Sequence, residues 1–234
     1  PGQTMATAKG LKAVILPDGG ALGRDFWRFD WLSHFLAHQG YAVLRASARG
    51  YSGAGDTWFR DNGFQSWQRA VDGVIAAGRW LERQGISAPG KLGVVGWSHG
   101  GYAALQAAAT EPSLFKAVVA IAPLTDLARF KQERREWTDF QVISAEIGSG
   151  EHIRTASPAQ NAARIRAPVL MFHGTFDRTF DYRQSTAMAA RLKSAGVPHE
   201  VVLFEKLDHD LHDSTVRTDM LRKIDGFLAA NGVR

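Results

Sequence analysis

Ser98 lies between two glycines in the segment GWSHG, residues 96 to 100. The apolar run KLGVVG precedes it and an alanine-rich stretch with helical spacing follows, so the pattern G-x-S-x-G joins a predicted strand to a predicted helix. In a nucleophile elbow, such a turn exposes the serine hydroxyl, and Gly96 and Gly100 would leave room where strand and helix nearly touch. The alternative is an ordinary glycine-rich turn. The strand-turn-helix context favours the elbow and predicts Ser98 as a nucleophile.

A serine hydroxyl needs a base to remove its proton, and the chain has eight histidines. His209, in FEKLDHDLHD, follows the last predicted strand and therefore falls at the same end of a parallel sheet as Ser98. His209 is the predicted base, and His212 is its local alternative. The other six have different predicted settings: His34 and His38 on a helix, His99 pointing away from the serine, His152 and His199 without obvious partners, and His173 as a satisfied core residue.

The acid that orients the base should follow another strand and stand between serine and histidine in the chain. Asp177, in VLMFHGTFDRTF, comes three residues after Gly174 and is the predicted acid. Asp126, in APLTDL, is the rival. Asp208 and Asp210 flank His209 too closely in sequence to orient it and are interpreted as solvated residues.

Acyl transfer also needs hydrogen-bond donors for the developing oxyanion. One predicted donor is the backbone N–H of His99. The other should come from the loop LPDGGALGRDF, where Gly19 and Gly20 leave the backbone uncovered. An ordinary Asp-Gly turn is the alternative interpretation of this loop.

Short apolar runs and helical segments alternate along the chain, which predicts an open, doubly wound α/β sheet. The predicted strands are 12–16, 41–46, 91–96, 116–122, 168–174 and 199–205. Helical spacing recurs in FWRFDWLSHFLAHQG, WQRAVDGVIAAGRWLERQG and STAMAARLKSAG, which end at Gly40, Gly85 and Gly196. Residues 1–234 are predicted to form a single domain. An insertion at about 125–160 is interpreted as a cap over the strand ends, or as a surface helix and loop.

Composition excludes several classes of protein. The 234 residues are 45% apolar and 22% charged, as in soluble globular proteins, and no apolar run approaches the ~20 residues that span a bilayer. The absence of cysteine excludes disulfides and thiolate metal sites. The net charge of +5 is scattered, without a basic block, so neither nucleic-acid nor membrane binding is expected. No metal or organic cofactor is implied. A cytoplasmic location is favoured over a periplasmic or secreted one.

The chain resembles the catalytic domain of the prolyl oligopeptidase family, which includes dipeptidyl and acylaminoacyl peptidases. The motifs that carry the resemblance are SARGYSGAG, WSHGGYAAL, SPAQNAARIRAPVLMFHGTFD and LDHD. The resemblance implies an α/β-hydrolase fold, with a mostly parallel sheet and flanking helices. It implies Ser98, Asp177 and His209 as the triad, and Gly20 and His99 as the oxyanion donors.

Three departures from the family pattern matter. Asp18-Gly19-Gly20-Ala21 stands where the family usually has His-Gly-Gly-Pro, and His99 replaces the usual tyrosine of the elbow. No segment of the chain can form the family's N-terminal β-propeller, and the first two strands of a complete α/β-hydrolase sheet are interpreted as truncated. The start at Pro1 favours a fragment of a longer protein over a minimal relative.

The favoured function is a serine hydrolase that cleaves peptide bonds of short peptides through an acyl-enzyme. A carboxylesterase acting on small esters is the alternative, and a non-catalytic binding module on the same scaffold is a third reading. Trp27 and Trp97 could line an acyl pocket, although core positions are the simpler interpretation. A β-propeller in the full-length protein and a homo-oligomer are the partners left open.

Overall fold

The computed structural model describes residue 4 and residues 6–20, 29–46 and 61–234. Within these ranges, the elements are β1 Leu11–Pro17, α1 Trp31–His38, β2 Ala42–Ala46, η1 Gly63–Ser66, α3 Trp67–Arg83, β3 Ser87–Trp97, α4 His99–Thr110, β4 Ala117–Ile121, α5 Leu127–Glu133, α6 Phe140–Ile147, α7 His152–Thr155, η2 Pro158–Arg164, β5 Val169–Gly174, α8 Arg183–Ser194, β6 His199–Phe204 and α9 Ser214–Ala230. The η elements are 3-10 helices.

The strands form one sheet in the order β2-β1-β3-β4-β5-β6, and every neighbouring pair is parallel. Consecutive strands therefore connect through crossovers, and the order reverses between β1 and β3. The doubly wound α/β fold predicted from the alternating pattern is confirmed. Because the strands are parallel, all of them end at the same edge of the sheet, where residues that follow β3, β5 and β6 come together.

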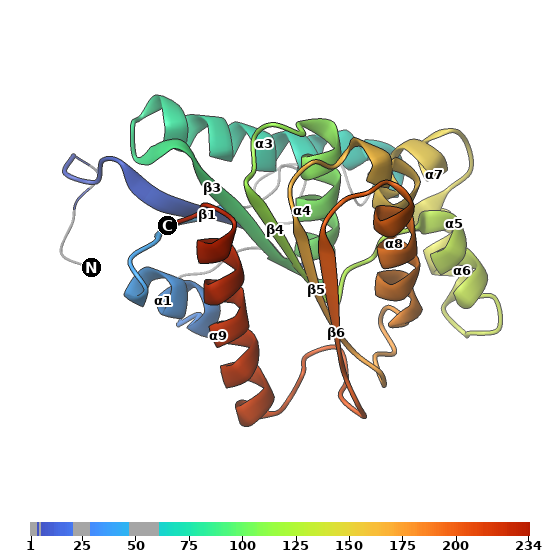
Figure 1. The fold of residues 1–234 in the computed structure, drawn as a ribbon. Helices are drawn as coiled ribbons and strands as arrows, with labels where there is room; N and C mark the ends of the chain where they lie inside the picture. The colour runs from blue at the N-terminus through green and yellow to red at the C-terminus, as the bar shows by residue number, and fades with distance from the viewer. Residues whose placement is uncertain (1–3, 5, 21–28, 47–60) are drawn as a thin grey trace.

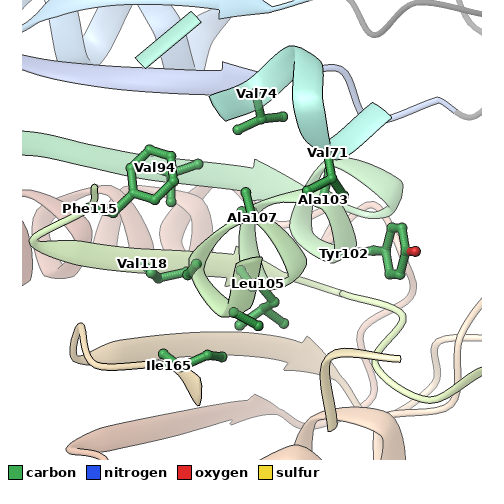
Figure 2. Packing of buried hydrophobic residues seen from close by; sticks show 14 of the residues in the cluster. Val71, Val74, Val94, Tyr102, Ala103, Leu105, Ala107, Phe115, Val118 and Ile165 are labelled. Carbon is green, nitrogen blue, oxygen red and sulfur yellow. The ribbon is translucent and has the colours of Figure 1, made fainter. Parts of the chain in front are cut away.

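Each face of the sheet has its own hydrophobic core, because successive residues of a strand point to opposite faces. On one face, Ile15 and Val94 pack with residues of α3, α4 and α8. On the other face, Val14 and Val95 pack with residues of α1 and α9. Figure 2 shows the first core, where side chains of α4 lie over Val94 and Val118 of the sheet. The inner strands are thus buried on both sides, which explains their nearly continuous apolar sequences, whereas the edge strands β2 and β6 are only half-buried.

The three predicted helices end where the sequence indicates, but two begin elsewhere: α8 begins at Arg183, two residues before the predicted segment, and α1 begins later than predicted. Gly40, Gly85 and Gly196 follow α1, α3 and α8 with φ values of +88°, +67° and +71°. Helix α1, predicted from Phe26 onward, begins at Trp31 instead. The Asp30 side chain accepts a hydrogen bond from the Ser33 N–H, as an N-cap does, and Phe29 lies outside the helix. Residues 26–28 fall outside the described residues.

Residues 125–160 form the short helices α5, α6 and α7 and the start of η2. Figure 1 shows α5, α6 and α7 gathered beside α8, at the β6 side of the molecule. The interpretation of this segment as a cap stays a prediction. In the part of the chain that the structure describes, no helix has the length and apolar character needed to cross a membrane.

Candidate active site

Ser98 occupies a strained turn between β3 and α4. Its φ of 58° and ψ of −124° lie in a region that residues other than glycine rarely adopt. The Ser98 N–H donates to the Ile121 carbonyl at 2.8 Å, so pairing with β4 continues up to this residue. The strand therefore carries Ser98 to the sheet edge, and the turn projects it there.

The two flanking glycines make this turn possible. A Cβ placed on Gly96 would lie 2.1 Å from the Gly100 carbonyl oxygen. A Cβ on Gly100 would lie 2.5 Å from the carbonyl oxygen of Pro17, the last residue of β1. The first glycine lets the strand approach the helix, and the second lets the end of β1 approach the helix.

His209 and Asp177 form a continuous hydrogen-bonded series with Ser98. The Oγ of Ser98 lies 2.9 Å from His209 Nε2, and His209 Nδ1 lies 2.7 Å from Asp177 Oδ2. The three residues follow β3, β5 and β6, so they come from loops at one sheet edge. The structure thus brings together the predicted nucleophile, base and acid, in the arrangement that orients an imidazole toward a hydroxyl.

Asp177 has hydrogen bonds to both oxygens. Its side chain is fully buried, and Oδ1 accepts from the backbone N–H groups of Thr179 and Phe180 at 2.7 and 2.9 Å. Burial alone would raise the pKa of Asp177. Hydrogen bonds and charge interactions with His173 and His209 outweigh burial, and the pKa lies well below its ordinary value. Asp177 is therefore an anion at neutral pH.

Neighbouring side chains hold His209 from two sides. The Trp97 indole Nε1–H donates to the His209 carbonyl at 3.1 Å, and the Phe180 ring lies edge-on to the imidazole at 5.7 Å. Only 17% of the His209 side chain is exposed. The imidazole is thereby fixed, with its Nε2 edge toward Ser98.

The two predicted oxyanion donors lie in different settings. His99 is the first residue of α4, so its N–H lies at the helix N-terminus, where the partial positive charge favours an anion. The Gly20 N–H donates to Asp18 Oδ1 at 3.2 Å, a long hydrogen bond across a tight turn. The remainder of this loop, from Ala21 to residue 28, and the SARGYSGAG motif with residues 47–55 fall outside the described residues.

The alternatives for acid and base serve other purposes. Asp126 caps α5, where it accepts from the Arg129 N–H at 3.0 Å. His212 is exposed, and its Nδ1 lies 3.0 Å from Asp208. His212 lowers the pKa of that exposed carboxyl group. Three further histidines contact backbone carbonyls: His34 with Asp30, His152 with Ile147 and His199 with Val197.

A cavity of about 670 Å³ adjoins Ser98 and His209. Trp31 and Trp97 line it and meet edge to face, with ring centroids 5.7 Å apart. The Arg217 guanidinium, also at the cavity wall, lies 5.2 Å from the centroid of the Trp31 ring. Trp97 therefore borders the cavity, whereas Trp27 falls outside the described residues.

The sequence did not reveal Arg134, at the end of α5. This buried guanidinium donates to the carbonyl oxygens of Arg178 and Thr179, both at 2.6 Å, and pairs with Asp139 at 3.0 Å. It therefore ties the 125–160 segment to the loop that carries Asp177. No local sequence signal predicts this contact, because the partners are 44 and 45 residues apart.

Comparisons with known proteins identify one family. The model of the prolyl oligopeptidase family matches residues 27–232. Dipeptidyl aminopeptidase BIII of Pseudoxanthomonas mexicana is 26% identical over 225 residues, which are 92% of this chain and 32% of that protein. The acylamino-acid-releasing enzyme of Rattus norvegicus is 24% identical over 216 residues, 88% of this chain and 29% of that protein.

A solved Mycobacterium tuberculosis structure, described as a puromycin-hydrolyzing peptidase, superposes with a TM-score of 0.87 at 25% identity. It covers 95% of this chain and 34% of that one. The α/β-hydrolase fold expected from the motifs is confirmed. The chain spans about a third of the length of the curated relatives it matches.

Proposed function

The chain belongs to the prolyl oligopeptidase family, and on that premise we propose that it is the hydrolase domain of a serine peptidase. We assign Ser98 as the nucleophile, His209 as the base and Asp177 as the acid that orients it. The observation that carries the proposal is the hydrogen-bonded series from Ser98 Oγ through both nitrogens of His209 to a buried carboxylate. A base and a buried acid in line with a serine hydroxyl are the partners that a nucleophilic serine requires.

In the proposed reaction, Ser98 Oγ attacks the substrate carbonyl carbon while His209 Nε2 accepts the hydroxyl proton. The carbonyl electron pair moves to oxygen, and the His99 N–H stabilises the resulting oxyanion. Asp177 stabilises the imidazolium. The C–N bond then breaks, His209 returns its proton to the leaving amine, and an acyl-enzyme remains. Water, activated by the same imidazole, attacks the ester and releases the acid and Ser98.

Gly20 is the second proposed oxyanion donor, and Asp18 makes its contribution conditional. The Gly20 N–H already donates to the Asp18 carboxylate, at the long distance of 3.2 Å. An incoming oxyanion must replace that acceptor, and it must also lie near a second negative charge. We therefore assign the larger share of oxyanion stabilisation to His99.

For the substrate, we propose the amide bonds of short peptides, in keeping with relatives named dipeptidyl aminopeptidase and acylamino-acid-releasing enzyme. The relatives are about three times longer than this chain. In the whole protein, we propose that a β-propeller precedes this domain and restricts the access of long peptides to the active site. A graded series of peptide lengths tests that restriction, and light scattering tests whether the protein forms a homo-oligomer.

Matched substrates test the reaction class. One acyl group is offered as an anilide and as an ester, to the parent and to Ser98→Ala. The proposal predicts that the parent cleaves both and that the variant cleaves neither. Cleavage of the ester alone would indicate the carboxylesterase instead, because an amide needs its poor leaving group protonated. If a folded parent cleaved neither, the result would count against a hydrolase and favour an incomplete fragment or a binding module.

A further inference from the structure

We propose that His173 is a positioning residue that holds the Asp177 carboxylate, and through it His209, in the productive geometry. This inference rests on the proposed function. His173 lies in β5, four residues before Asp177, and its side chain is fully buried. The sequence predicts no more than a satisfied core histidine at this position, but its partners in the fold belong to the candidate active site.

Both nitrogens of the His173 ring have hydrogen-bond partners. Nε2 lies 3.0 Å from Asp177 Oδ2 and 2.9 Å from the Phe180 carbonyl oxygen. Nδ1 lies 2.8 Å from the hydroxyl of Ser185, on α8. The imidazole therefore bridges the loop after β5 and the helix that covers it.

These partners assign the tautomer. A carbonyl oxygen and an ionised carboxylate can only accept, so Nε2 must carry the proton that it shares between Asp177 and Phe180. The Ser185 hydroxyl can then donate to Nδ1. With the proton on Nε2, all of these contacts are satisfied at once, which fixes both the ring orientation and the position of that proton.

Asp177 Oδ2 consequently receives N–H groups from two imidazoles, that of His209 at 2.7 Å and that of His173 at 3.0 Å. Without His173, the only imidazole bonded to Oδ2 would be that of His209, which is the ring that Asp177 has to orient. The same Nε2–H also fixes the Phe180 carbonyl, in the residue whose ring lies edge-on to His209. The Nε2 proton of His173 therefore constrains the Asp177 carboxylate and also Phe180, whose ring contacts His209.

Three variants separate positioning from packing. His173→Gln keeps an N–H donor near the Nε2 position, whereas His173→Met fills a similar volume without a donor. Ser185→Ala is the matched control, since it removes a hydrogen bond from the same buried ring but leaves the contact with Asp177. Loss of a charge-assisted hydrogen bond should lower kcat by roughly 10- to 100-fold in His173→Met, with KM nearly unchanged. The kcat of His173→Gln should lie within about fivefold of the parent value, and the kcat of Ser185→Ala within about threefold.

Equal losses in folded Gln and Met variants, or a Met variant with the kcat of the parent, would overturn the proposal. If the Met variant does not fold, nitrogen-15 NMR of the histidines in the unsubstituted protein decides. His173 should be protonated at Nε2, and protonation at Nδ1 alone would overturn the inference. Failure of the proposed function is distinguishable, because the parent would then turn over no substrate, whereas the NMR measurement of the His173 tautomer would still support or overturn the contact with Asp177.

Discussion

At the scale of single residues, burial disfavours the charged form of both Asp177 and His99, but only His99 loses its charge. Asp177 keeps its charge because both of its oxygens accept hydrogen bonds, from two imidazoles and two backbone N–H groups. His99 lies against the rings of Phe64 and Tyr102, at centroid distances of 6.1 and 5.2 Å. Burial lowers the pKa of His99 to about 4, so the imidazole beside the nucleophile is neutral.

His99 should therefore make the fold sensitive to acid. The unfolded chain binds this proton below about pH 6.5 and the folded chain only below about pH 4, so stability falls as the pH drops through that window. His99→Phe removes the titration and keeps an aromatic ring. From pH 7.5 to pH 5, the free energy of unfolding should fall by about 2 kcal/mol more in the parent than in the variant. Urea titrations at both pH values measure it, and equal decreases would refute this account.

At the scale of elements, the candidate site depends on the close approach of the end of β1 to the N-terminus of α4. Gly100 permits that approach, since any Cβ there would meet the carbonyl oxygens of Pro17 and Asp18. Gly174 has a similar role at the end of β5, where a Cβ would lie 2.3 Å from the carbonyl oxygen of Leu207. That contact brings the loop of His209 against the strand that leads to Asp177.

Gly100→Ala should push the end of β1, and with it Gly20, away from Ser98. We expect a loss of about 1–3 kcal/mol in the free energy of unfolding, as for other overpacked sites, together with a lower kcat. Gly226→Ala is the control, because a Cβ at this exposed position of α9 meets nothing within 4 Å. It should stabilise the protein by roughly 0.5–1 kcal/mol. Denaturation and kinetics of both variants test this, and a Gly100→Ala protein with parental kcat would contradict it.

The sequence predicts the elements well, because each strand and helix carries its own periodic signal and glycines mark the helix ends. It also predicts that Ser98, Asp177 and His209 come together, since loops that follow parallel strands share one edge. Contacts between distant side chains have no such signal. The bond from His173 to Asp177 and the contact of Arg134 with the Asp177 loop depend on how the sheet and helices pack. The long hydrogen bond from the Gly20 N–H to the Asp18 carboxylate is also not predicted, because it depends on the exact geometry of one turn.

At the scale of the whole molecule, the sheet separates two cores, and the site sits at the end of the strands rather than within either core. Helix α9 packs so closely on the sheet that a Cβ on Gly93 would lie 2.9 Å from Leu228 Cδ2. This contact is five residues before Ser98 along β3, a distance of roughly 16 Å in an extended strand. Packing there should support stability without shaping the site.

Leu228→Ala tests that separation. Leu228 is fully buried, and its truncation should lower the free energy of unfolding by about 2–5 kcal/mol. The kcat of the folded fraction should stay within about twofold of the parent, because the strand end keeps its geometry. Thermal unfolding and kinetics well below the melting temperature measure the two effects. A large fall in kcat in fully folded protein would show that the α9 core and the site are coupled.

The central claim is that Ser98 is an activated nucleophile, and intact mass after exposure to a fluorophosphonate probe tests it most directly. The probe phosphonylates only a serine whose proton a base can remove, with fluoride as the leaving group. We predict one adduct on the parent protein and none on Ser98→Ala. A folded parent that gains no mass, or a Ser98→Ala variant labelled as readily as the parent, would contradict the account.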